Sequence, residues 1–173
     1  MLRNLAAALF LTEREIDEFD PNPPKVKGRI ITTLQKAKEV RPIVERCVTI
    51  ARRTLDSQQE ADRLNTTATR GSDEWKAWRK GEGWQKWAKA SAPVVSARRR
   101  VLVLLGDRQA MHLVFDKIAP RFADRPGGYT RILQLAKPRL GDAGTRAILE
   151  FVGVRDRVAR AAVAPKFDEP AAT

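Results

Sequence analysis

The sequence predicts an α+β fold, in which a small three-stranded mixed sheet is covered on one face by helices and carries a helical insert. Three observations predict this fold. Apolar residues recur at helical spacing over residues 2–15 and 32–55. Runs rich in β-branched residues occur at 26–33 and in two stretches between 129 and 154. A chain of 173 residues with 43% hydrophobic residues can build one core, and only the helices can cover the apolar face of so small a sheet.

The first elements follow from local sequence signals. An amphipathic helix is expected over 2–15, and "DPNPP" should end it because prolines cannot continue a helix. "VKGRIITT" then predicts a short strand. The apolar stripe of 32–55 predicts a helix in which Pro42 either introduces a kink or begins a second helix.

Two helices and a hairpin are expected in the second half of the chain. A helix over 96–105 should close at Gly106, and Asp107 should cap a further helix that Pro120 stops. "YTRILQLA" and "TRAILEFVGV" predict the strands of a hairpin with a long loop. Residues 1–160 thus form one domain, and residues 161–173 are expected to be a disordered tail because they offer little to bury.

Charge narrows the class of partner. The formal net charge is +12 and the pI is about 10.5, which favours an anionic partner, either phosphate or anionic lipid. The excess positive charge lies in residues 1–54 and 98–160, whereas the segment between them is nearly balanced.

The residues for catalysis or metal binding are missing from the sequence pattern. His112 is the only histidine, so a Ser-His-Asp triad or a metal cage would depend on it, and its position between the apolar residues of a helix indicates an ordinary surface or boundary side chain. We therefore expect no enzyme activity, no small-molecule substrate, no cofactor and no metal. The single cysteine, Cys47, falls on an apolar helix face and predicts a buried thiol in a reducing compartment.

Membrane association is not expected. The apolar run 5–11 is short, and charged residues follow it where a signal peptide would have its cleavage site. No other apolar run approaches the length of a membrane span. These features predict a soluble, cytoplasmic protein.

Several stretches of the chain are similar to a known family. "RNLAAAL", "TTLQKAKEVR", "DRQAMHLVFDKIAPRF", "GGYTRI" and "RLGDAGTRAILEFV" occur in the order typical of the bacterial large-subunit ribosomal protein family numbered seventeen. The resemblance covers about three quarters of the chain. It implies a non-catalytic protein of the ribosome that binds 23S rRNA and has neighbouring large-subunit proteins as further partners. A free-standing nucleic-acid-binding or regulatory protein with the same fold is the alternative.

The chain departs from the family pattern in two places. The resemblance implies a basic arm ahead of Met1, so its absence here predicts either a start codon assigned too late or a protein without that arm, and we favour the first. The segment 56–95 is an insert where the family has a short connection, and it holds all four tryptophans. These could pack the insert or, with the lysines and arginines between them, bind RNA or a protein. We favour packing.

Candidate RNA-binding residues come from the basic clusters and from the resemblance. In "PRFADRPGGYTRI" the arginines suit phosphates, the glycines allow close approach, and the tyrosine can stack or donate a hydrogen bond, although the same stretch could be a solvated turn. The arginine run at 98–100, read as the N-terminus of a helix, would favour an external anion or be a charged face. The predicted set is Arg3, Asn4, Lys36, Lys38, Arg41, Arg98, Arg99, Arg121, Arg125, Gly127, Gly128, Tyr129, Arg131, Lys137 and Arg139.

Overall fold

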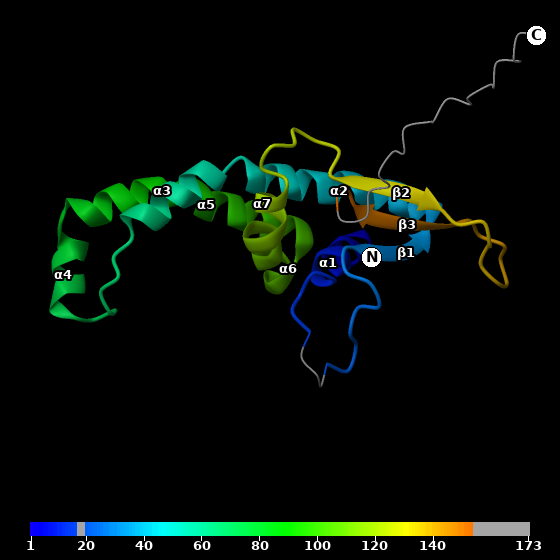
Figure 1. Cartoon of the computed structure of the whole chain (residues 1–173), viewed down its shortest axis with the longest axis horizontal. Helices are drawn as coiled ribbons and strands as arrows, with labels where there is room; N and C mark the ends of the chain where they lie inside the picture. Colours follow the sequence, from blue (N-terminus) through cyan, green and yellow to red (C-terminus); the bar gives the residue numbers. More distant parts are fainter. Residues whose placement is uncertain (17–19, 154–173) are drawn as a thin grey trace, which may run out of the picture.

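A computed structural model of the chain describes residues 1–16 and 20–153. A small sheet lies at one end of an elongated molecule, a helical arm extends from the other end, and further helices lie between them (Figure 1). The predicted tail, 161–173, lies outside the described residues. The helical elements are α1 (Leu2–Leu11), α2 (Leu34–Arg52), α3 (Leu55–Leu64), α4 (Asp73–Lys80), α5 (Glu82–Leu105), α6 (Arg108–Leu113), η1 (Val114–Ile118) and α7 (Ala119–Arg121). The strands are β1 (Arg29–Thr33), β2 (Thr130–Gln134) and β3 (Arg146–Phe151).

The sheet confirms the predicted hairpin but not the predicted mixed topology. Its strand order is β1-β3-β2, and β3 pairs antiparallel with both neighbours. The prediction of a mixed sheet is therefore wrong, because β1 enters the sheet beside β3 and runs opposite to it. The α+β class itself is confirmed.

One face of the sheet is covered by helices, as predicted. Leu149 of the central strand lies opposite Ile30 and Ile132, and this row faces the core, where Leu149 is fully buried. α2 contacts all three strands and α1 contacts β1. The alternate residues point away from the helices, so Ile31 and Leu133 remain 55% and 43% exposed.

α1 ends at Leu11, earlier than predicted, and the side chain of the next residue, Thr12, forms hydrogen bonds that redirect the chain. The hydroxyl of Thr12 donates to the carbonyl of Leu9 at 2.6 Å and accepts from the backbone N–H of Gly28 at 2.9 Å. This pair of bonds turns the chain at Thr12 and holds the entry to β1 against the end of α1.

α2 is one helix that contains Pro42, which is exposed. Its buried stripe is the predicted one and includes Cys47, so the expectation of a buried thiol is confirmed. Gly106 has a positive φ of 72° and ends α5, and the carboxylate of Asp107 accepts from the N–H of Ala110 at 2.6 Å, as expected for the two caps.

The helical segment from α6 to α7 contains a wider π-helical turn just before Pro120. α6 continues through η1, a π-helical turn, into α7, and Pro120 lies inside α7 with the helix ending one residue later. Proline lacks an N–H and its ring crowds the carbonyl four residues earlier, and a wider turn relieves both problems.

The expected start of a helix at Ser96 is wrong. α5 runs without a break from Glu82 to Leu105, so the last part of the predicted insert and the following core helix are one element. The run Arg98–Arg100 therefore lies inside a helix rather than at its N-terminus, and the argument from the helix dipole does not apply to it.

The arm consists of α3, α4 and the first half of α5, with α3 packed along α5 (Figure 1). The rings of Trp78, Trp84 and Trp87 contact one another, with centroids 4.9 to 6.1 Å apart. The guanidinium of Arg79 lies 5.0 Å from the centroid of Trp75 and 5.2 Å from that of Trp84. None of the four belongs to the buried residues of the main core, so the tryptophans pack the arm, as favoured.

Candidate RNA interface

The loop between α7 and β2 exposes only some of the residues that the sequence predicted to bind RNA. Gly127 and Gly128 are exposed, and Gly128 has a positive φ of 65°, which suits glycine. Arg125 is exposed, and its Nε donates a hydrogen bond to the carbonyl of Gly127 at 3.2 Å. This part of the loop can contact a partner.

Tyr129 does not lie on that surface. Its side chain is fully buried, and its ring lies 5.1 Å from that of Phe122. A ring enclosed in the core cannot stack on a base, so the stacking role expected for Tyr129 is corrected to a packing role. The loop enters the core at this residue because the carboxylate of Glu45 accepts its backbone N–H at 3.1 Å.

Two of the predicted arginines are held by nearly buried carboxylates. Arg121 forms a bidentate pair with Glu13: its Nη1 donates to Oε1 at 3.2 Å and its Nη2 donates to Oε2 at 3.1 Å. The Glu13 side chain is 9% exposed. Arg131 donates from Nε to Glu150 at 2.6 Å, and that carboxylate is only 4% exposed. Both arginine side chains are 30% exposed, and their ion pairs with these carboxylates give each of them a role in the fold.

The cations of α2 differ from one another. Lys38 and Arg41 are exposed, whereas Lys36 is partly buried. Arg41 lies 3.8 Å from Glu45, one turn along the helix. Lys36 and Lys38 make no hydrogen bond or ion pair with another described residue.

Lys36 lines a small basic pocket that the sequence did not reveal as a unit. The pocket has a volume of about 300 Å³ and lies where β1 leads into α2. Its wall combines hydroxyl, ammonium and guanidinium groups, and no carboxylate of the described residues lines it. The lining residues are Ile31, Thr32, Thr33, Lys36, Arg139 and Arg146.

Arg146 of this pocket was missing from the predicted set. It is the first residue of β3 and lies directly opposite Thr33 of β1. Thr33 precedes the first turn of α2, where the N–H of Leu34 already donates to the carbonyl of Thr145 at 3.0 Å and the positive end of the helix dipole favours an anion. The available signal was the arginine at the start of a predicted strand, but its closeness to Lys36 depends on the pairing of β1 with β3.

The loop between β2 and β3 contains a local ion pair. Arg139 is paired with Asp142, and this hydrogen bond, together with one from the backbone N–H of Gly144, holds the pKa of the Asp142 carboxyl well below its ordinary value. The same carboxylate raises the pKa of Arg139. Lys137 in this loop is exposed and makes no such pair with another described residue.

The remaining predicted residues lie on α1 and α5. Arg3 and Asn4 are exposed, and the side chain of Arg3 lies across Gly106. Arg98 points toward η1, where its guanidinium lies 5.4 Å from the ring of Phe115 and 4.0 Å from Asp116. Arg99, the next residue, is exposed on a different face of the helix.

Groups for metal binding are not gathered in the described part of the chain. No cluster of three or more His, Cys, Asp or Glu side chains could hold an ion there. His112 is exposed, as expected. Over the same residues, none of the helices combines the length and the apolar character needed to cross a bilayer.

The fold and its surface define a basic α+β protein whose outward cations suit an anionic partner. Residues 1–152 match the family model described as Ribosomal protein L17, and the chain belongs to this family. The resemblance drawn from the sequence motifs is thereby confirmed.

The relatives carry the name Large ribosomal subunit protein bL17. The protein from Rhodopirellula baltica is 63% identical over 171 residues, which cover 99% of this chain and 81% of the relative. The protein from Halothermothrix orenii is 37% identical over 125 residues, 72% of this chain and 75% of the relative. The protein from Thermomicrobium roseum is 34% identical over 152 residues, which cover 88% of this chain and 83% of the relative. The first of these alignments spans the insert.

Proposed function

We propose that the protein is a structural constituent of the large ribosomal subunit, where its basic surface binds 23S rRNA and stabilises the folded RNA. Membership of the ribosomal protein L17 family supports the subunit assignment. In this role the protein performs no catalysis and needs no cofactor, and it acts in the cytoplasm as part of the ribosome, beside neighbouring large-subunit proteins.

The observation that carries RNA binding is the set of outward cations without an internal partner. Arg3, Lys36, Lys38 and Lys137 make no hydrogen bond or ion pair with another residue among 1–16 and 20–153. A protein gains little from these four unpaired cations in its own fold, since like charges repel one another. Phosphates of a folded RNA would neutralise them.

The basic pocket beside α2 gives this surface a defined anchor. A phosphate placed there would meet Lys36, Arg146 and the first turn of α2 together. Arg125 with the open glycines of its loop provides a second point of contact with the RNA backbone. Contacts of this kind fix the position of the RNA and do not read its sequence.

The proposal is tested by measuring the affinity of the full chain for deproteinised 23S rRNA over a range of salt concentrations. We expect the affinity to fall by orders of magnitude between low and moderate salt, because bound phosphates release counterions. An affinity that does not change with salt contradicts phosphate binding.

A second experiment separates a ribosomal constituent from a free-standing regulator of the same fold. Large subunits purified through a high-salt wash should contain about one copy of the protein each. A regulator would be washed off, and its recovery far below one copy per subunit would overturn the assignment.

A further inference from the structure

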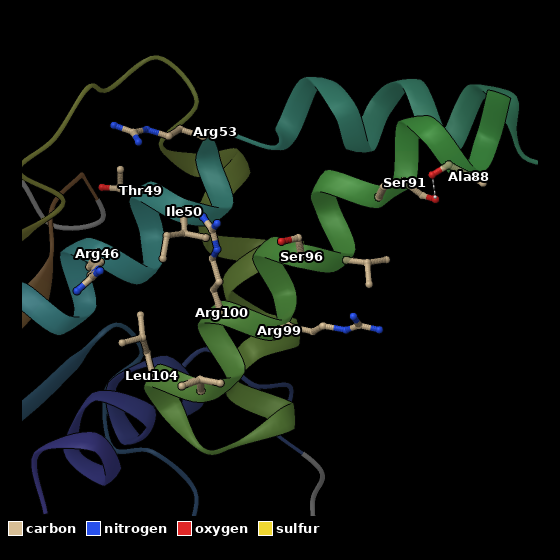
Figure 2. Close-up of a pocket in the computed structure, with 13 residues that line it drawn as sticks. Arg46, Thr49, Ile50, Arg53, Ala88, Ser91, Ser96, Arg99, Arg100 and Leu104 are labelled. Carbon is tan, nitrogen blue, oxygen red and sulfur yellow. Dashed lines mark hydrogen bonds between the residues drawn. The ribbon is translucent and has the colours of Figure 1, made fainter. Parts of the chain in front are cut away.

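A long groove runs between α2 and α5 on the side of the molecule that bears the arm (Figure 2). Its volume is about 1090 Å³, larger than the pocket beside α2. The wall formed by α2 consists of residues spaced by three and four, and the same is true of α5, so the groove follows one face of each helix. It is lined by Arg46, Thr49, Ile50, Arg53, Ala88, Ser91, Ala92, Val95, Ser96, Arg99, Arg100, Val103 and Leu104.

The length of the groove suits a regular element rather than a small molecule. The lining of α5 extends from Ala88 to Leu104. At a rise of about 1.5 Å per residue, this wall is about 24 Å long, which equals about four turns of a helix laid along it.

Aliphatic side chains form much of the groove. Ile50 and Leu104 are partly buried and pack against the main core, so they form its floor. Val95 and Val103 are 43% and 69% exposed. Valines left in water along a groove indicate a surface that another apolar surface covers.

The charged residues of the groove are all positive. Arg46 comes from α2, Arg53 directly follows that helix, and Arg99 and Arg100 come from α5. No carboxylate lines the groove, and among the described residues none of the four arginines has a hydrogen-bond or ion-pair partner. In Figure 2 Arg46 and Arg53 lie on one side of Ile50, and Arg99 lies on the other.

We propose that this groove binds an acidic amphipathic helix of a neighbouring protein in the large subunit. The apolar face of such a helix covers Ile50, Val95 and Val103, and its acidic flanks pair with the arginines of both walls. RNA phosphates would satisfy the arginines but provide no apolar side chains for the valines, so the combination favours a protein. The proposal rests on the assignment to the large subunit.

The test uses the full chain assembled into large subunits in the cell, with the photoreactive residue p-benzoylphenylalanine in place of Val103. Because Val103 is largely exposed, its replacement leaves the fold intact. After irradiation we expect a cross-link to another protein, at a segment with apolar residues spaced by three and four and Asp or Glu on both sides. Replacement of Leu140, which is 99% exposed in the β2–β3 loop, is the matched control and should not cross-link to that segment.

Charge reversal provides an independent readout. In the Val103 photoreactive chain, Arg99→Glu together with Arg100→Glu should reduce the yield of the protein cross-link at least fivefold. Arg108→Glu, on α6 and outside the groove, should leave the yield unchanged.

The outcomes distinguish this inference from the proposed function. If the chain is recovered in large subunits but Val103 cross-links only to rRNA, only within its own chain, or not at all, the docked helix is wrong and the subunit assignment stands. A cross-linked protein segment without acidic residues also overturns it. If the chain is absent from large subunits, the proposed function itself fails, and the inference with it.

Discussion

Arg131 donates a hydrogen bond of 2.6 Å from its Nε to the carboxylate of Glu150, which is almost completely buried on the outer face of the sheet. The two residues lie opposite each other on β2 and β3. From the other side, Arg29 of β1 places its Nε 3.4 Å from the same carboxylate. One carboxylate of the central strand thus ties both outer strands together.

This relationship predicts that Arg131→Ala destabilises the fold. Among the described residues, the substitution leaves the buried charge of Glu150 with Arg29 as its cationic neighbour, and we expect the free energy of unfolding to fall by about 1–3 kcal/mol. Urea denaturation measures the change. The control is Arg125→Ala, which removes an exposed arginine of the neighbouring loop and should change stability by no more than about 0.5 kcal/mol. Equal effects of the two substitutions would contradict the structural role of Arg131.

Glu45 predicts a second stability effect. Its carboxylate accepts the backbone N–H of Tyr129, the backbone N–H of Thr130 at 2.9 Å and the hydroxyl of Thr130 at 2.7 Å, and so joins α2 to the start of β2. Glu45→Gln weakens these charge-assisted bonds and turns an amide group toward donors, so we expect a loss of about 1–3 kcal/mol. Glu39→Gln, exposed on the same helix, is the control. A denaturation midpoint shared by both variants would refute the role given to Glu45.

The sequence predicted those features that depend on local patterns. The apolar stripe of α2, the buried position of Cys47, the caps at Gly106 and Asp107 and the β2–β3 hairpin all follow from spacing and turn residues, and each is confirmed. The start of α5 was missed because its Ala- and Ser-rich stretch around Pro93 has no strong helical pattern. Its packing against α3 is a tertiary contact that the sequence does not display.

The candidate site was harder to predict from the sequence, because it also depends on tertiary contacts. Glu13, Glu45 and Glu150 determine which cations and which loop residues are held in the fold, yet Glu13 is 108 residues from Arg121, and Glu45 is 84 from Tyr129. Adjacent glycines suggested that Tyr129 was exposed, whereas the core begins at that residue. The pocket shared by Lys36 and Arg146 required the strand pairing, and the groove required the meeting of α2 with α5.

The buried thiol predicts a dependence of stability on alkaline pH. Burial raises the pKa of Cys47 from its ordinary value of 9.0 to about 12. Since the folded-state pKa lies above the unfolded one, the stabilisation is complete below pH 9 and is lost as the pH rises toward 12. Between pH 8 and pH 10 the free energy of unfolding should fall by about 1 kcal/mol more for the native chain than for Cys47→Ala. Identical pH profiles would show that the thiol ionises equally in both states.

The basic pocket predicts how RNA binding responds to charge. Lys36→Ala with Arg146→Ala should weaken binding to 23S rRNA and lower the steepness of the salt dependence by about two phosphate contacts. The charge-conserving pair Lys36→Arg with Arg146→Lys is the matched control and should keep most of the salt dependence. Both affinities are measured by filter binding over the same salt series. A salt dependence that the alanine pair leaves unchanged would exclude the pocket as a phosphate site.

The structure of the arm predicts that it can be shortened without unfolding the rest of the protein. Its buried residues Ala61, Ala90 and Val94 are absent from the main core cluster, and its tryptophans contact one another. Because α5 is continuous into the core, a deletion must spare its second half. We therefore expect that replacing 65–87 with a Gly/Ser linker of about six residues leaves the rest folded, since closing a loop depends only weakly on its length.

Two measurements on the shortened chain decide the role of the arm. Thermal unfolding should remain cooperative, with a midpoint close to that of the full chain, because the main core is untouched. Recovery in high-salt-washed large subunits should also remain near one copy, since the unpaired cations of the proposed RNA surface and the groove residues all lie outside 65–87. A chain that no longer folds would place the tryptophans in the folding core. A chain that folds but is lost from subunits would make the tip of the arm a binding surface.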